Sequence, residues 1–111
     1  AFTGVPFAPG MIVINEPGLY LTGQYGIRIE NCCLINEIIS AQKSITGHGP
    51  FYGLEDLTKV PYARNLIETA LLNDQEIQAI DQYHRAIFNL LCEDLPIDVR
   101  NWLKMATHQL T

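Results

Sequence analysis

Short apolar runs alternate with glycine and proline over the first third of the chain, a pattern typical of β-strands joined by tight turns. Residues 11–16 (MIVINE) combine an apolar run with a closing carboxylate, and residues 27–35 contain a second predicted strand. The segment between them, 17–26, should stop the first strand, because proline removes a ladder donor and glycine permits unusual backbone angles. We therefore expect the two strands to fold back on each other across this glycine-rich turn.

Charged and apolar residues alternate in the second predicted strand. Side chains along a strand point to opposite faces in turn, so Arg28 and Glu30 share one face while Ile27 and Ile29 take the other. The apolar partner strand ends in Glu16. This arrangement makes the charged face a candidate lining of a cavity.

Two further strands are predicted before the helical part. Residues 38–44 and 52–60 have strand-like composition, and Pro61 ends the second run. The loop 46–50 between them contains His48, which we interpret as a loop residue.

The last third of the chain has helical periodicity. Asn73 is a good N-cap, and Glu76 three residues later completes a capping-box pattern. Apolar positions then recur at helical spacing to about residue 93. This stripe consists of Ile77, Ile80, His84, Ile87, Phe88 and Leu91.

A second helix is predicted over 96–107, after a break at Leu95 and Pro96. Its buried face should contain Val99, Trp102, Leu103 and Ala106. Strands that are followed by a pair of helices indicate the α+β class.

Charge and hydropathy narrow the possible partners. The 111 residues carry 7 basic and 12 acidic side chains, a formal net charge of −5, without a basic cluster. Nucleic acid and anionic membrane surfaces are therefore not expected as partners. No apolar run approaches the roughly 18 residues of a membrane span, and the start lacks a signal-peptide pattern. The missing initial methionine hints at a piece of a longer protein or at processing.

The cysteines do not form a disulfide framework. Cys32 and Cys33 are adjacent and so lie on opposite faces of the second predicted strand, while Cys92 falls on a helix. No CxxC spacing is present, which argues against a cysteine-built zinc site. We interpret all three as reduced, mostly packing residues of a cytosolic protein.

Glu16 and Glu30 are the residues that point to chemistry. Two ionised carboxylates in one pocket repel each other, so they must be protonated, paired with a cation or bound to a metal. Arg28 is a candidate cation, which gives a buried Arg–Glu network without a metal. Alternatively, the carboxylates form half of a site for Mn²⁺ or Mg²⁺, which favour about six oxygen-type ligands. Spacing alone leaves both interpretations open.

Several segments resemble a known enzyme family. MIVINEPGLY at 11–20 and YGIRIEN at 25–31 are similar to the last two metal-ligand motifs of aminopeptidase P, the Xaa-Pro aminopeptidases of the pita-bread metallopeptidase family. GLEDLTKVP at 53–61 resembles that family's FEPLTLVP segment, with Asp56 in place of a proline. Further similarity, to the C-terminal extension of the longer, cytosolic-type enzymes, lies in 72–76, 83–84 and 102–107.

The resemblance implies a C-terminal fragment of a pita-bread fold, with antiparallel strands followed by a C-terminal helical hairpin. Residues 1–61 are then the end of the catalytic domain with the last two metal-ligand motifs, and residues 62–111 are a helical extension. The implied parent is a cytoplasmic metallopeptidase. It hydrolyses the bond between an N-terminal residue and a following proline, so its substrates are peptides with proline in the second position.

The resemblance also implies roles at single positions. The family binds two divalent ions, usually manganese, through two aspartates, one histidine and two glutamates. Glu16 matches the first glutamate, a metal ligand that is also a proposed proton shuttle for the attacking water and hence catalytic. Glu30 matches the second glutamate, which bridges both ions, and Arg28 then orients a carboxylate. His84 is expected in the core, and nothing marks His108 as functional.

Three of the family's five ligands belong to motifs upstream of this chain. We therefore expect the chain by itself to lack peptidase activity and not to retain the two metal ions. Strands without their upstream partners leave an open edge and an apolar face, which favour self-association or a homodimer. Two other functions stay open: a non-catalytic pita-bread relative that binds peptides or proteins, and an interaction module built on the C-terminal helices.

Overall fold

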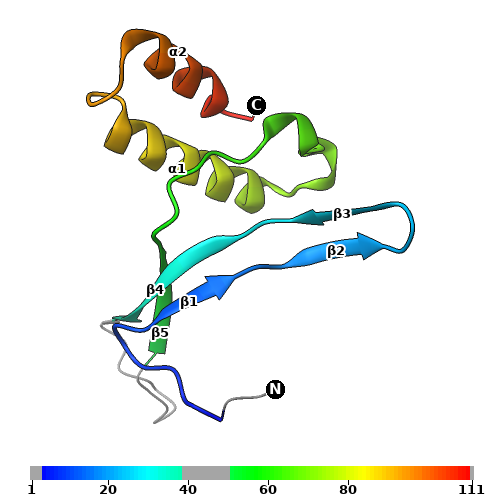
Figure 1. The fold of residues 1–111 in the computed structure, drawn as a ribbon, viewed down its shortest axis with the longest axis vertical. Coiled ribbons are helices and arrows are strands. Elements are labelled where there is room, and N and C mark those ends of the chain that lie inside the picture. Colours follow the sequence, from blue (N-terminus) through cyan, green and yellow to red (C-terminus); the bar gives the residue numbers. More distant parts are fainter. Residues whose placement is uncertain (1–3, 39–50, 111) are drawn as a thin grey trace. The chain divides into compact units, whose positions relative to one another are not determined.

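A computed structural model of the chain describes residues 4–38 and 51–110, drawn as a ribbon in Figure 1. The predicted strand over 38–44 therefore lies outside the described residues from position 39 onwards. The same holds for the predicted loop that contains His48.

The chain divides into two compact units, Ala1–Thr58 and Lys59–Thr111. Among the described residues, the strands belong to the first unit and the helices to the second. Antiparallel strands followed by two C-terminal α-helices confirm the predicted α+β class. The assignment of domains on either side of residue 61 stays a prediction.

The described strands pair antiparallel. They are β1 (Ile12–Asn15), β2 (Gly18–Leu21), β3 (Tyr25–Arg28), β4 (Asn31–Ile38) and β5 (Phe51–Asp56). One sheet has the order β1–β4–β5, and β2 pairs with β3. The strand predicted at 11–16 corresponds to β1. The strand predicted at 52–60 corresponds to β5, but β5 ends at Asp56, so the prediction is wrong for 57–60. The strand predicted over 27–35 is instead split between β3 and β4.

β1 and β2 together form one arm of a long hairpin, and β3 and β4 form the other, as Figure 1 shows in blue and cyan. Asn15 pairs with Asn31 at the end of one ladder, and Gly18 pairs with Arg28 at the start of the next. Two residues separate the ladders on each arm. The pairing register therefore continues unchanged across the interruption.

Pro17 explains why the ladder is interrupted. It lies opposite Ile29, whose backbone N–H donates to the Pro17 carbonyl at 3.1 Å. Because proline has no N–H, the reciprocal hydrogen bond of this pair cannot form. The two arms are thus joined by one hydrogen bond at a pair that would normally have two.

The turn of the hairpin is shorter than predicted. It comprises residues 22–24, with Gly23 at a φ of +72°, and the Gln24 N–H donates to the Leu21 carbonyl at 3.0 Å. Positive φ favours glycine at this position. The prediction of a turn over all of 17–26 is wrong, because β2 lies within that range. Gly18 belongs to β2, where the absence of a side chain leaves room for a neighbouring one.

β4 contains the buried residues of the first unit. Asn31, Cys33 and Ile35 lie on one face of the strand and are 5%, 1% and 1% exposed. Cys32 lies on the other face and is exposed, which confirms that the adjacent cysteines point to opposite sides. The packing role predicted for the cysteines therefore holds for Cys33 and is wrong for Cys32.

The second unit contains two short 3₁₀ helices, η1 (Arg64–Leu66) and η2 (Thr69–Leu71), followed by α1 (Asp74–Leu91) and α2 (Ile97–Ala106). The predicted capping box of α1 is present. Asn73 Oδ1 accepts the Glu76 N–H at 3.0 Å, and the Glu76 carboxylate accepts the Asn73 N–H at 2.9 Å. These bonds satisfy amide donors that a helix start leaves unpaired, so α1 begins where the sequence predicts.

α2 buries less of its surface than predicted. Leu103 is 2% exposed, as expected, but Trp102 is 60% exposed and Val99 is 38% exposed. The predicted burial of Trp102 and Val99 is therefore wrong. Consecutive helical residues point about 100° apart, so the side that carries Leu103 can be covered while the neighbouring side stays open.

Polar contacts fasten the segment that follows α2 to earlier parts of the same unit. Asp81 Oδ1 accepts the Leu110 N–H at 2.9 Å. The Arg64 guanidinium donates to the carbonyl of His108 and, at 2.9 Å, to that of Gln109. Backbone groups near the end of the described chain thus find partners on α1 and η1.

His84 is a fully buried residue of α1. Its Nε2 accepts the Tyr62 N–H at 3.0 Å, so the predicted core position with a satisfied ring nitrogen is confirmed for Nε2. Nδ1 has no hydrogen-bond partner among the described residues.

The rings of Tyr62 and Tyr83 stack at 4.6 Å, and the Tyr83 hydroxyl donates to the Val60 carbonyl at 3.0 Å. α1 therefore holds the 60–62 segment by hydrogen bonds and by stacking.

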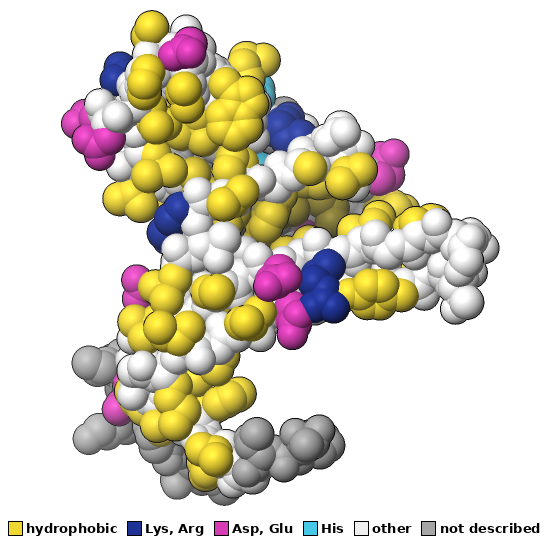
Figure 2. All heavy atoms as spheres, in the orientation of Figure 1, with side chains coloured by type: hydrophobic (Ala, Val, Ile, Leu, Met, Phe, Trp, Pro, Cys, Tyr) yellow, Lys and Arg dark blue, Asp and Glu magenta, His cyan; other side chains and the backbone are white. Residues whose placement is uncertain are grey.

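Many apolar side chains of the described residues are exposed. Figure 2 shows them over much of the drawn face, with only scattered charged groups between them. On the long hairpin, Leu19, Ile27 and Ile29 are 58%, 44% and 48% exposed. Self-association through such surface stays a prediction. No helix of the described part of the chain is long and apolar enough to cross a membrane.

We expect the second unit to lose stability as the pH falls below about 6.5, the ordinary pKa of histidine. Burial lowers the pKa of His84, and the nearby Arg64 guanidinium lowers it further while Asp81 opposes the shift. Between the lowered and the ordinary pKa, the unfolded chain binds more protons than the folded one, so acid favours unfolding. Urea unfolding on either side of this pH range measures the effect.

The matched control for this prediction is His84→Gln, because an amide oxygen can accept the Tyr62 N–H but does not titrate. The variant should lose the part of the pH dependence that belongs to His84. An identical pH dependence in the two proteins contradicts the prediction.

Candidate metal centre

The continuous register of the hairpin places Glu16 directly opposite Glu30. Hydrogen-bonded and non-hydrogen-bonded pairs alternate along an antiparallel ladder, and the adjacent pair of Pro17 and Ile29 is hydrogen-bonded. Glu16 and Glu30 are therefore a non-hydrogen-bonded pair, whose Cβ atoms lie about 4.5–5.5 Å apart on one face. The register therefore places opposite each other the two residues that the sequence singles out.

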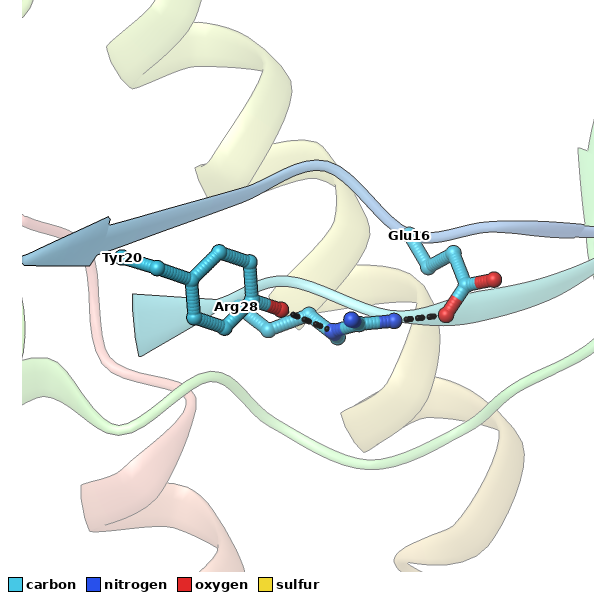
Figure 3. A network of polar contacts seen from close by, with 3 residues as sticks. All are labelled: Glu16, Tyr20 and Arg28. Carbon is cyan, nitrogen blue, oxygen red and sulfur yellow. Dashed lines mark hydrogen bonds and ion pairs between the residues drawn. The ribbon is translucent and has the colours of Figure 1, made fainter. Parts of the chain in front are cut away.

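Arg28 shares this face with Glu30, as the alternation along the strand predicts. Its guanidinium donates to the Glu16 carboxylate through Nη1 and, at 2.7 Å, to the Tyr20 hydroxyl through Nε (Figure 3). The guanidinium carbon also lies 5.6 Å from the Tyr20 ring centroid, within the range of a cation–π contact. Tyr20 thus holds Arg28, and Arg28 in turn orients the Glu16 carboxylate.

Two glycines make room for the Tyr20 ring. Gly26 lies directly opposite Tyr20, and Gly18 lies two residues before it on the same face. A Cβ atom at Gly26 would lie 2.6 Å from Cδ1 of the ring, and a Cβ atom at Gly18 would lie 2.7 Å from its hydroxyl oxygen. Any larger residue at either position would displace the ring, so glycine allows the Tyr20 hydroxyl to reach Arg28.

Sequence reasoning missed the role of Tyr20. The available signal is an aromatic residue whose cross-strand partner is a glycine, with a second glycine two positions away on the same strand. Rings commonly cover strand glycines in such pairs. To use this signal one must know the register, which depends on the length of the turn.

The exposure of the Arg28–Glu16 ion pair limits its effect on stability. The two side chains are 39% and 48% exposed, and exposed ion pairs contribute about 0–1 kcal/mol. The Arg–Glu contact considered from the sequence therefore exists, but as an exposed pair and not as a buried network. Its cation offsets part of the repulsion that Glu16 and Glu30 experience as like charges directly across a ladder.

Carboxylate oxygens suit hard divalent cations such as Mn²⁺ and Mg²⁺, so the chemistry of Glu16 and Glu30 fits a metal centre. Such ions take about six ligands, however, and two side chains provide only part of that number. Within residues 4–38 and 51–110, no group of three or more His, Cys, Asp or Glu side chains is arranged to hold a metal ion. The pair is therefore a partial site.

Two family models match the chain. A model described as the C-terminal region of peptidase M24 matches residues 50–110, which is more than half of the chain. A model described as metallopeptidase family M24 matches residues 1–37, which include both glutamates of the pair.

Two similar proteins have the same name. A protein of Aspergillus flavus named "Probable Xaa-Pro aminopeptidase P" is 38% identical over 112 residues, covering 99% of this chain and 17% of its own length. A Fusarium vanettenii protein with the same name is 45% identical over 86 residues, covering 78% of this chain and 14% of its own length. The chain therefore spans less than a fifth of the length of these relatives.

A solved structure is similar as well. The X-prolyl aminopeptidase of Caenorhabditis elegans, described as a cytosolic enzyme with a di-nuclear active site, matches with a TM-score of 0.83 and 31% sequence identity. The match covers 96% of this chain and 17% of the worm enzyme. The similarity thus includes both units of this chain.

We expect Gly26→Ala to move the Tyr20 ring and break its hydrogen bond with Arg28. Tyr20 is 58% exposed and its ring can turn into solvent, so the loss of stability should be about 1 kcal/mol, the net value of one hydrogen bond. The Arg28 Nε–H resonance should shift and exchange faster with water. In the control Gly53→Ala, the new Cβ meets Ile38 at 3.2 Å and should leave that resonance unchanged. An unchanged resonance in Gly26→Ala contradicts the prediction.

Proposed function

The chain belongs to the M24 metallopeptidase family and matches the model of that family's C-terminal region. We therefore propose that it carries half of the metal centre of an Xaa-Pro aminopeptidase. The parent protein hydrolyses the bond between an N-terminal residue and a following proline. Two findings support this activity for the longer protein of which the chain represents a part: the names of the similar proteins, and the large share of this chain that their matches cover.

The observation that carries the proposal is the placement of Glu16 directly opposite Glu30. Like charges at directly opposed positions destabilise a ladder, so a stabilising contact between the two glutamates does not explain this pair. Of these two carboxylates, Arg28 contacts only that of Glu16. A divalent ion held by both glutamates would remove the remaining repulsion, and a di-nuclear active site is described for the similar worm enzyme.

In the proposed centre, Glu16 and Glu30 are this chain's ligands for two divalent ions, with Mn²⁺ as the ion. Glu30 would contribute its carboxylate to both ions, whereas Glu16 would hold one ion and would also accept and return a proton of the attacking water. The ions, when bound, lower the pKa of that water and polarise the scissile carbonyl. Arg28 orients the Glu16 carboxylate, and Tyr20 keeps Arg28 in place.

The other ligands come from the part of the parent protein that this chain does not span. Residues 1–61 are the end of the catalytic domain, and residues 62–111 are its C-terminal extension. Substrates are peptides with proline in the second position. The parent works in the cytoplasm, and it forms a homodimer or self-associates. The isolated chain, with only two ligands, is inactive.

Titration of Mn²⁺ into the isolated chain should give no sub-micromolar binding, because two carboxylates leave most of the ion's roughly six positions to water. Calorimetry measures this affinity, and an Xaa-Pro peptide should remain uncleaved. The comparison is Glu16→Gln. Sub-micromolar binding that disappears in this variant would sink the proposal that the chain is incomplete.

In the full-length parent protein, Glu30→Gln should lower kcat/KM by more than the 10–100-fold that loss of an outer hydrogen bond around a metal typically costs. It should also reduce the amount of Mn²⁺ that the purified protein contains. An amide is a weaker ligand than a carboxylate and cannot balance the charge of two ions. Glu37→Gln is the matched control, since Glu37 is an exposed carboxylate near the other end of β4. Equal activity and metal content in the two variants would count against a ligand role for Glu30.

A further inference from the structure

Asp56 contacts the start of β4 from β5. Its Oδ1 accepts two hydrogen bonds, from Asn31 Nδ2 at 3.0 Å and from Cys33 Sγ at 3.4 Å. Cys33 lies directly opposite Asp56 in the ladder, and Asn31 is its diagonal neighbour on the same face. Both donors are almost completely buried, at 5% and 1% exposure, so water competes little for these bonds.

The backbone after Asp56 continues this contact. The Leu57 N–H donates to the Cys32 carbonyl at 2.8 Å, and Thr58 Oγ1 accepts the Cys32 N–H at 2.9 Å. β1 pairs with the same part of β4 from its other edge. The chain is therefore fixed on both edges from Asn31 onwards, immediately after Glu30.

The position of Asn31 bears directly on Glu30. Consecutive side chains of a strand point to opposite faces, so Asn31 on the buried face implies that Glu30 projects from the other face, where Glu16 lies. A rotation of the strand about its axis would move both side chains together. The hydrogen bond from Asn31 to Asp56 thus limits the directions in which the Glu30 carboxylate can point.

We propose that Asp56 is a positioning residue for Glu30. By holding Asn31 and Cys33 on the buried face, it keeps the Glu30 carboxylate directed to the face of Glu16, where one ion can contact both. The inference rests on the proposed function of Glu30 as a metal ligand. Asp56 acts through the strand, because its own carboxylate lies on the face opposite to the two glutamates.

A pair of neighbouring residues allows a matched test in the full-length parent protein. Asp56→Ser removes the acceptor for Asn31, because the serine side chain is too short to reach it. Glu55→Ser is the control. Glu55 accepts an equivalent hydrogen bond from Asn36 Nδ2 at 2.6 Å, between the same two strands but on the exposed side and farther from Glu30. Asp56→Asn retains an oxygen acceptor and should restore the function lost in Asp56→Ser.

Calorimetric titration of Mn²⁺ into metal-free protein is the main measurement. Affinity should be about 10–100-fold weaker in Asp56→Ser than in Glu55→Ser, the range for residues that orient a metal ligand. The electron paramagnetic resonance spectrum of bound Mn²⁺ should change in Asp56→Ser and return in Asp56→Asn. A merely structural role would lower the melting temperature and leave the spectrum of the folded protein unchanged.

Equal Mn²⁺ affinities and spectra in Asp56→Ser and Glu55→Ser overturn the inference. If Asp56→Ser does not fold, Asn31→Ser removes the same hydrogen bond from its donor side and is compared with Glu55→Ser in the same way. Glu30→Gln separates this inference from the proposed function. Loss of Mn²⁺ binding in Glu30→Gln but not in Asp56→Ser overturns only the positioning role, whereas unchanged binding in Glu30→Gln overturns both.

Discussion

The pairing register of one hairpin determines where the candidate ligands of this chain lie. The two arms keep the same register through the pair at which Pro17 removes a hydrogen bond. A slip of one residue on either arm would turn Glu16 or Glu30 to the other face, because side chains alternate along a strand. The short turn at 22–24 and the glycine opposite Tyr20 both suit one register only. The geometry of the glutamate pair therefore depends on residues that have no ligand role themselves.

The two faces of the sheet at the start of β4 differ in exposure and in the contacts that they make. The face with Glu16 and Arg28 is exposed, and its ion pair adds little to stability. The face with Asn31 and Asp56 is shielded, and there an unsatisfied polar group costs roughly 1–3 kcal/mol. The shielded hydrogen bonds therefore lie on one face, and the two glutamates with Arg28 lie on the other.

Features that depend on neighbouring residues could be predicted from the sequence. The capping box of Asn73 and Glu76 spans three residues, and the shared face of Arg28 and Glu30 follows from strand alternation. To predict that Glu16 lies opposite Glu30, one must also know the pairing register of the hairpin. The predicted turn was too long to give that register. Asp56 gave no signal, because aspartate is disfavoured in strands and its donor Asn31 lies 25 positions away. The prediction of buried residues on α2 was partly wrong for a similar reason, because contacts with residues distant in the sequence decide which side of the helix is covered.

The three-residue turn also affects the order of folding. Hairpins of this kind close within about 1–10 microseconds, whereas segments far apart in a large protein meet much more slowly. Glu16 and Glu30 thus come together through a local event that needs no residue from outside the first unit. A two-stranded hairpin is marginal by itself, and pairing of β4 with β5 then secures it. The opposition of the two acids is thus fixed early in folding, before any contact that depends on distant parts of a longer chain.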